Sequence, residues 1–232
     1  MMKKPVFYTE LAYFAAMLLN SMGNALMEKS DMGINMVVAP VYLLHLKLVD
    51  TLPFFTFGFA EKVCQAVLIL VTMLLVRRIK LAYFFSFCSA FLYGTLLDVM
   101  IDIAAPLPDD TLPMRIALFA AGVLLCGVGV SLIFRSYISP EAYELIVKET
   151  TACYHLDLGR FKLAYDCGSL VLGVLLSFLF YGFGHFEGVK WGTVVYAVIN
   201  GPMIALFSRW LDRMFDFRDG FRLRSFFEAS AQ

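Results

Sequence analysis

Long apolar runs alternate with short polar segments along the whole chain, and six of the runs are long enough to cross a lipid bilayer. A helix needs about 20 mainly apolar residues to cross a hydrocarbon core about 30 Å thick. The pattern therefore predicts an all-α, polytopic membrane bundle. Its six spanning helices are expected at residues 7–28, 54–76, 81–103, 114–134, 162–184 and 189–208.

Two further segments, 34–48 and 139–153, are too short or too polar to be ordinary spans. The second carries Glu141, Glu144 and Glu149. Each charge costs up to about 3 kcal/mol at the bilayer centre, against about 0.5 kcal/mol gained per Leu, Ile or Val. We therefore expect two short helices that are re-entrant, interfacial or broken and that do not cross the membrane alone.

The starts of these short helices can also be predicted. Ser139 followed by Pro140 indicates a helix start, with serine as the N-cap and proline in the first turn. Glu141 would then lie at the positive end of the helix dipole. By analogy, Asn35 is expected to cap the short helix in the first half.

The same order of features occurs twice along the chain. A glycine-rich stretch at 23–35 has a counterpart at 127–140, and each is followed by one short segment and two long apolar runs. Residues 1–104 and 105–208 are therefore predicted to be two membrane repeats. With three spans in each repeat, the second enters the membrane from the opposite side, an inverted arrangement found in many secondary transporters.

Composition supports a membrane protein and excludes other classes. Sixty per cent of the 232 residues are hydrophobic and 16% are charged, whereas soluble domains have about 45–50% apolar and about 25% charged residues. The net charge is zero, so no broad basic field favours nucleic-acid binding. The aromatic and cationic tail, residues 209–232, is expected to lie on lipid headgroups, with a nucleic-acid or partner patch as the alternative.

The distribution of basic residues predicts the orientation. Arg77, Arg78 and Lys80 form a tight basic turn between the second and third predicted spans. Cytoplasmic loops are enriched in Lys and Arg, so this turn is expected inside and the acidic turn at Asp109 and Asp110 outside. Both chain termini are then cytoplasmic.

Polar residues within apolar segments are the candidate binding residues, because buried carboxylates and amides in a membrane are costly. Each also has a structural interpretation: an intramembrane ion pair, a neutralised carboxylate or an amide hydrogen bond between helices. The repeat places Gln65 and Asp166 at related depths, where a solute between the halves could reach both. The predicted substrate-binding set is Asn24, Glu61, Gln65, Asp98, Glu141, Glu144, Asp166 and Asn200.

The sequence contains no catalytic or metal-binding motif. The five cysteines show no C-x-x-C spacing, the three histidines are scattered, and neither H-E-x-x-H nor a nucleophile elbow occurs. We therefore expect no enzyme activity, no metal and no cofactor.

Three segments carry a resemblance to a known family. They are Met32-Gly33-Ile34-Asn35, Ile138-Ser139-Pro140-Glu141 and the stretch from Gly192-Thr193 to Asn200-Gly201-Pro202. In these segments, and diffusely over nearly the whole length, the chain resembles the YczE/YitT-type bacterial membrane proteins. The resemblance implies doubled helical units in the bacterial cytoplasmic membrane and a presumed transport role, without a substrate. The chain departs from the expected pattern at Asn35-Met36.

Three functions remain open from the sequence. The first is a transporter that works by alternating access between the repeats, with or without coupling to protons. Its solute would be small and cationic or zwitterionic, because buried acids outnumber buried bases. The second is the substrate-binding subunit of an importer whose separate ATPase module supplies the work. The third is a non-transporting accessory protein. The expected partners are the solute, the lipid bilayer, and either a second copy in a homodimer or the ATPase, with no nucleic acid.

Overall fold

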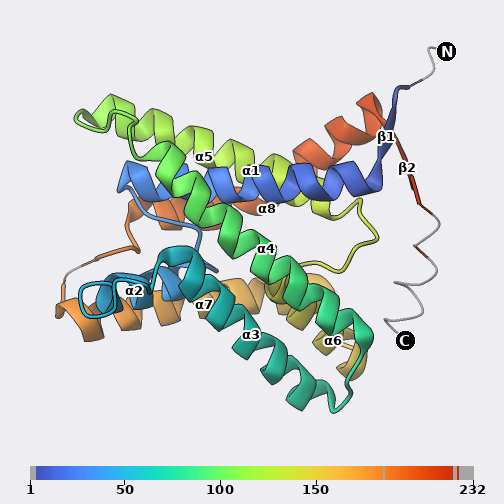
Figure 1. Cartoon of the computed structure of the whole chain (residues 1–232), viewed down its shortest axis with the longest axis horizontal. Coiled ribbons are helices and arrows are strands. Elements are labelled where there is room, and N and C mark those ends of the chain that lie inside the picture. Colours follow the sequence, from blue (N-terminus) through green and yellow to red (C-terminus); the bar gives the residue numbers. More distant parts are fainter. Residues whose placement is uncertain (1–3, 185, 222–223, 225–232) are drawn as a thin grey trace.

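The computed structural model describes residues 4–184, 186–221 and 224, which form eight helices and two short strands (Figure 1). The strands are β1 (Val6–Tyr8) and β2 (Asp216–Arg218). The helices are α1 (Thr9–Ser30), α2 (Ala39–Leu48), α3 (Phe57–Val76), α4 (Leu81–Ala104), α5 (Leu112–Ile133), α6 (Ala142–Tyr154), α7 (Leu158–Tyr181) and α8 (Trp191–Met214).

The predicted all-α class is confirmed, and each expected element corresponds to one helix. The six predicted spans match α1, α3, α4, α5, α7 and α8, while the two short segments form α2, with 10 residues, and α6, with 13 residues. Of the described helices, α3, α4, α5, α7 and α8 are long and apolar enough to cross a membrane. Helix α1 has the length, 22 residues, but Asn20 and Asn24 and its charged ends lower its hydropathy.

The outer faces of the long helices are strongly apolar. Leu74 on α3 is 76% exposed and Val198 on α8 is 71% exposed. Helix α7 buries only Gly173 and Ser177. Such faces would be unstable in water but are the surface that lipid chains require. The protein is therefore a multi-pass membrane protein.

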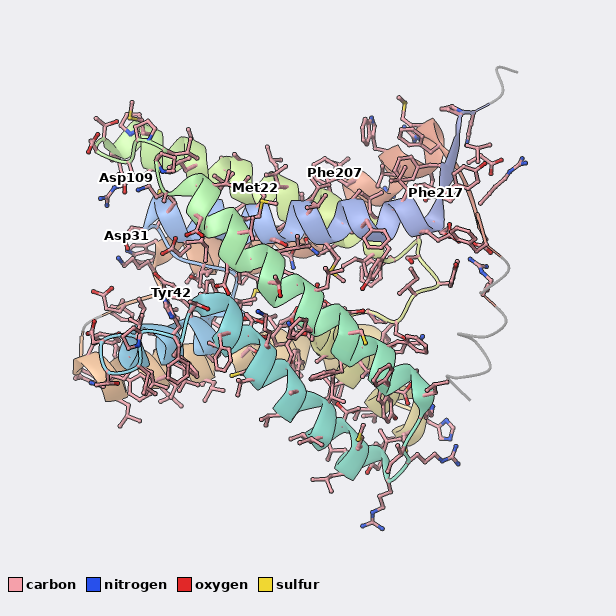
Figure 2. The ribbon with its side chains drawn as sticks, in the orientation of Figure 1. Met22, Asp31, Tyr42, Asp109, Phe207 and Phe217 are labelled. Atoms are coloured by element: carbon pink, nitrogen blue, oxygen red, sulfur yellow. The ribbon has the colours of Figure 1, made fainter. Side chains whose placement is uncertain are left out.

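Ion pairs mark two opposite ends of the bundle. At one end, here called the Asp31 end, Asp31 pairs with Arg115 and Lys190, and Lys29 pairs with Asp109. At the other, here called the Arg135 end, Arg135 pairs with Asp212 at 2.8 Å. Figure 2 shows Asp31 and Asp109 at the left of the molecule and Phe217 at the right. Helices α1, α5 and α8 connect the two ends (Figure 1).

Helices α1 and α5 run side by side along the upper part of the molecule in Figure 1 and pack on each other more extensively than any other pair. They meet at two glycines. A Cβ atom on Gly23 would lie 2.7 Å from the Gly122 carbonyl oxygen, and one on Gly122 would lie 2.6 Å from the Gly23 carbonyl oxygen. Both distances are shorter than any real Cβ contact, so the close backbone approach of the two helices requires glycine at each position.

The other helices pack around this pair in corresponding ways. The contact of α1 with α4 corresponds to that of α5 with α8, and the contact of α2 with α3 corresponds to that of α6 with α7. Helix α3 packs on α6, and correspondingly α7 packs on α2. In each case a helix of the first half takes the place of the helix four positions later in the chain. Two pairs lack such a counterpart. Helices α3 and α4 pack along each other at Gly58 and Gly94, whereas the fully described α7 and α8 do not form such a pair, and the smaller contact of α4 with α6 has no comparable match between α8 and α2. The repeat itself stays a prediction.

The predicted start of the second short helix is wrong by two residues. Helix α6 begins at Ala142, and its N-cap is Glu141 rather than Ser139. The reason is a contact with another helix, because the Ala142 backbone N–H donates to the Gln65 Oε1 atom on α3 at 3.2 Å. This bond satisfies one of the free N–H groups at the helix start, so a serine cap is not needed.

Asn35 also does not cap α2 directly. Helix α2 begins at Ala39 with Val38 as its N-cap. Asn35 instead stabilises the turn just before the helix, where its Oδ1 atom accepts from Val37 N and its carbonyl oxygen accepts from Ala39 N. The predicted cap therefore lies one turn too early.

The C-terminal segment differs from a simple interfacial tail. Helix α8 continues to Met214, and β2 then pairs in parallel with β1, with Phe7 opposite Phe217. The Glu10 carboxylate accepts hydrogen bonds from the backbone N–H groups of Gly220 and Phe221. The two ends of the helical region are thereby joined at the Arg135 end, while residues 222–223 and 225–232 of the predicted tail, including Arg222, lie outside the described residues.

The glycine crossing of α1 and α5 yields a stability prediction. Gly23→Ala should destabilise the protein by about 1–3 kcal/mol, because the added methyl group forces the two backbones apart. The control is Gly168→Ala on α7, where no atom lies within 4 Å of the added Cβ. Thermal unfolding in detergent should show a lower melting temperature for the first variant only. Equal melting temperatures would show that the crossing is not tight.

Candidate substrate chamber

A polar cavity of about 70 Å³ lies inside the bundle beside the α1–α5 pair. We call it the chamber. Its wall comes from α1, α4, α5, α6, α7, α8 and the segment before α2. The polar side chains in this wall are Asn20, Asn24, Asn35, Tyr93, Glu141, Tyr143, Glu144, Lys162, Tyr196 and Asn200.

Several oxygen atoms in the chamber wall have no hydrogen-bond partner among the described residues. They are Oδ1 of Asn20, Asn24 and Asn200 and Oε1 of Glu141. Asn20 is 7% exposed, Asn24 is 3% exposed and Glu141 is 5% exposed, so these oxygens lie deep in the protein. Buried polar atoms are almost always satisfied in folded proteins. A group of unsatisfied acceptors around one cavity indicates a place for a hydrogen-bond donor.

A second layer of polar groups holds the chamber wall in place. Glu61 on α3 is fully buried, and its Oε2 atom accepts from the Tyr143 hydroxyl at 2.8 Å and from Gln65 Nε2 at 3.1 Å. Gln65 also accepts from the Ala142 backbone through Oε1. These bonds join α3 to the start of α6, which fixes the position of Glu141 at the chamber.

The electrostatic environment of Glu141 favours its neutral form. Burial raises the pKa of the Glu141 carboxyl well above its ordinary value, and the neighbouring Glu144 and Glu61 carboxyls raise it further. Glu141 lies in the non-spanning segment, at the N-cap of α6. A buried acid without a paired base is shifted toward its protonated form, and a cation beside it shifts it toward the ionised form.

Lys162 connects two acidic groups at the side of the chamber. Its Nζ atom lies 2.9 Å from Asp166 Oδ1 on the same helix and 4.0 Å from Glu144 Oε1 on α6. Burial also raises the pKa of Glu144, although Lys162 opposes this shift. With Glu61 and Glu141, the region contains four carboxyl groups and one amine, so its net charge is negative when the acids are ionised.

A larger cavity of about 540 Å³ lies next to the chamber, toward the Arg135 end. We call it the vestibule. It is lined by the segment 133–140, by α6 and by the start of α7, and it includes Lys148 and Arg224. Ile133, Phe134, Glu144 and Lys162 line both cavities. The Glu144–Lys162 pair therefore lies at the boundary between the vestibule and the chamber.

Toward the Asp31 end, the chamber is covered by the segment between α1 and α2. Asn35, Val37 and Val38 line the chamber, while Ile34 is 1% exposed within the main apolar core. The Ile34 backbone N–H donates to Thr193 Oγ1 at the start of α8. Apolar packing and this hydrogen bond separate the chamber from the ion pairs of Asp31.

The structure brings together most of the residues predicted from the sequence. Asn24, Glu141, Glu144 and Asn200 line the chamber. Glu61 and Gln65 lie in the layer behind it, and Asp166 pairs with Lys162 in the wall. The sequence analysis did not select Asn20, Tyr93, Tyr143, Tyr196 and Lys162. Asn20 had a usable signal, because it lies one helical turn before Asn24 on the same face.

Asp98 lies away from the chamber. Its Oδ1 atom accepts from the Gly58 backbone N–H at 2.7 Å, and its Oδ2 atom accepts from the Thr56 hydroxyl at 2.9 Å. Thr56 is the N-cap of α3. The Asp98 carboxylate thus stabilises the first turn of α3 against α4.

No group of three or more His, Cys, Asp and Glu side chains in the described part of the chain is placed to hold a metal ion. The unpartnered acceptor oxygens of the chamber belong to three amides and one carboxyl group. The chemistry that this arrangement supports is binding of a small group with N–H donors and positive charge.

The fold and the chamber define a multi-pass α-helical membrane protein with an internal polar cavity. Residues 7–209 match the family of unknown function DUF6198, and the chain belongs to this family. No curated protein and no solved structure matches the chain. The resemblance to YczE/YitT-type proteins stays a prediction, because the matched family carries no functional description.

The contacts of Asp98 lead to a prediction that separates stability from binding. Asp98→Ala removes two hydrogen bonds at the start of α3 and should destabilise the protein by about 1–3 kcal/mol. Asp102→Ala, four residues later on α4 at an exposed position, is the control. Thermal unfolding should show a loss for the first variant alone. A solute that binds the wild type should bind folded Asp98→Ala equally well, and weaker binding would bring Asp98 back into the site.

Proposed function

We propose that this protein is a transporter of a small polar solute, cationic or zwitterionic, that exchanges the solute for protons in the bacterial cytoplasmic membrane. The binding site is the chamber, and the route from one side of the membrane is the vestibule. Both termini face the cytoplasm in this proposal, so the vestibule faces the cytoplasm as well. The predicted excess of Lys and Arg on that side supports this orientation.

One observation carries the proposal: a cavity with buried, unsatisfied acceptor oxygens adjoins a wider cavity at one end and is covered at the other. A structural amide cluster would satisfy its members with one another. An open pore would lack the apolar cover around Ile34. A site with access from one end at a time is the arrangement required for alternating access.

In this proposal the two predicted repeats supply the basis for the change of access. Helices α3 and α4 pack closely, whereas the corresponding α7 and α8 do not. If the repeats exchanged these two arrangements, the cover near Asp31 would open and the region beside Lys162 would close. The ion pairs of Asp31 with Arg115 and Lys190 are the contacts that must break in this step.

Proton exchange follows from the acids of the chamber. Empty, the chamber favours a protonated Glu141, and a bound cation favours the ionised form, so that binding releases a proton. The groups that face Glu141 from the surrounding helices are Tyr13 on α1, Glu61 on α3, Tyr93 on α4, Cys126 on α5 and Glu144 on α6, with Lys162 and Asp166 on α7 beyond them.

Transport by purified protein in liposomes is the direct test. An imposed pH gradient and a pH-sensitive dye inside the liposomes would detect solute-dependent proton movement for a panel of amines, guanidines and amino acids. Glu141→Gln should reduce transport to the rate of protein-free liposomes, because it removes the ionisable group. Asp102→Asn, on an exposed part of α4, should retain the wild-type rate.

One result would change the mechanism, and two others would favour a different function. Full transport by folded Glu141→Gln would remove Glu141 from the mechanism. Absence of any transport, with the acidic residues freely replaceable in cells, would favour a non-transporting accessory protein. Copurification of an ATPase and uptake that needs ATP would favour the substrate-binding subunit of an importer.

The raised pKa of Glu141 also predicts how solute binding depends on pH. A proton and a cation compete for the same carboxylate, so the affinity for a cation should fall as pH falls below the pKa of Glu141, by up to about tenfold per pH unit. Above that pKa the affinity should be constant. Equilibrium binding between pH 5 and 9 would measure this dependence, with folded Glu141→Gln giving a weak, flat profile. A wild-type profile without slope would contradict the proposed exchange.

A further inference from the structure

We propose that the solute of the chamber is a monovalent organic cation with several N–H donors and about four to six non-hydrogen atoms, of the size of guanidinium, methylguanidinium or a short alkylammonium. Glu141 is its counter-charge, and the amide oxygens of Asn24 and Asn200 accept its hydrogen bonds. This inference rests on the proposed transport function for its role, but it concerns only which ligand the chamber binds.

The volume of the chamber sets the size of the ligand. One water needs about 10–15 Å³ of such space, so a cavity of about 70 Å³ holds about five to seven atoms of this size. Guanidinium has four non-hydrogen atoms and methylguanidinium has five. Vitamins, nucleosides and most amino acids are too large for the chamber as it stands.

The unpartnered atoms set the hydrogen-bonding character of the ligand. All four are oxygens that accept: Oδ1 of Asn20, Asn24 and Asn200 and Oε1 of Glu141. The amide nitrogen of Asn24 already donates two hydrogen bonds, one to the Asn20 carbonyl oxygen and one to the Tyr93 hydroxyl. These bonds fix Asn24 with its oxygen as the free atom. A ligand that only donates hydrogen bonds therefore fits, and an anion does not.

The carboxyl groups set the charge. Glu141 has no basic partner among the described residues that line the chamber, because Lys162 is held by Asp166 and Glu144. A neutral donor such as urea would leave the Glu141 charge uncompensated when the carboxyl ionises. A monovalent cation compensates it, and charge-assisted hydrogen bonds are about twice as strong as neutral ones.

Aromatic rings favour an organic cation over a bare metal ion. Tyr93, Tyr143 and Tyr196 line the chamber, and Tyr93 and Tyr196 are among the largest fully buried side chains. The faces of such rings attract organic cations, and a planar guanidinium group stacks on them. A bare metal ion needs a shell of oxygen ligands around one point, whereas the chamber wall combines a few unpartnered oxygens with three tyrosine rings.

The experiment is equilibrium binding of radiolabelled guanidinium to the full chain in lipid nanodiscs. Unlabelled methylguanidinium and propylammonium, which has four non-hydrogen atoms, should displace the label. Urea, which has the shape of guanidinium without its charge, tetramethylammonium, which has the charge without N–H donors, and sodium should not displace it at equal concentration. Arginine, which carries the same group on a larger body, should displace it at least about tenfold more weakly.

Two independent variants locate the site. Glu141→Gln and Asn200→Leu should each weaken guanidinium binding by about tenfold or more, whereas Asp102→Asn should bind as the wild type does. Size-exclusion elution and thermal unfolding would show whether each variant is folded. The ligand series on the wild type tests the proposal even if one of the two variants does not fold.

The possible outcomes distinguish this inference from the proposed transport function. Displacement by urea or sodium, or no guanidinium binding at pH 8, overturns the inference. If a larger or neutral solute is then transported in a Glu141-dependent manner, transport stands and only the ligand class is wrong. If guanidinium binds with the stated selectivity and liposomes show no transport, the ligand class stands and the transport function is wrong.

Discussion

The close crossing of α1 and α5 at Gly23 and Gly122 is the constraint on which the rest of the structure depends. Only glycine allows the two backbones to approach so closely, and the packing of α4 on α1 and of α8 on α5 starts from this pair. The close approach of the two helices also holds the Asn20 side chain of α1 against Gly129 of α5. The chamber thus lies beside the most closely packed pair of helices, where dense packing resists small displacements.

The buried polar groups are satisfied by hydrogen bonds in one part of the protein and left partly unsatisfied in another. Most bonds that join α3 to α6 are fully made, as between Tyr143 and Glu61. The chamber wall beside them keeps several oxygens free. Leaving a buried acceptor unsatisfied costs about 1–3 kcal/mol, so these atoms reduce the stability of the empty protein. A ligand that satisfies them recovers part of that free energy, which links binding to stability.

Hydropathy is sufficient to predict the long helices, because each depends only on the apolar residues of its own segment and the thickness of the bilayer sets its length. It is not sufficient for the α6 cap or for β2, which depend on Gln65 and on Phe7, residues far away in the chain. Glu141 and Asn200 are selected from the sequence because polar groups at depth are costly, and both line the chamber. Asp98 met the same criterion, yet its contacts are with the start of α3. The tyrosines of the chamber gave no signal, since tyrosine is also common at membrane surfaces.

The pairing of β1 with β2 has a consequence for the number of membrane crossings. Strand β1 directly precedes α1 and β2 directly follows α8, so their hydrogen bonds hold the beginning and the end of the helical region together. A chain whose two extremities meet at one surface must traverse the bilayer an even number of times. The five strongly apolar helices alone give an odd number. Helix α1, with 22 residues, is long enough to be the additional crossing, and its two asparagines are buried against neighbouring helices while Leu11 and Phe14 are exposed on its outer face.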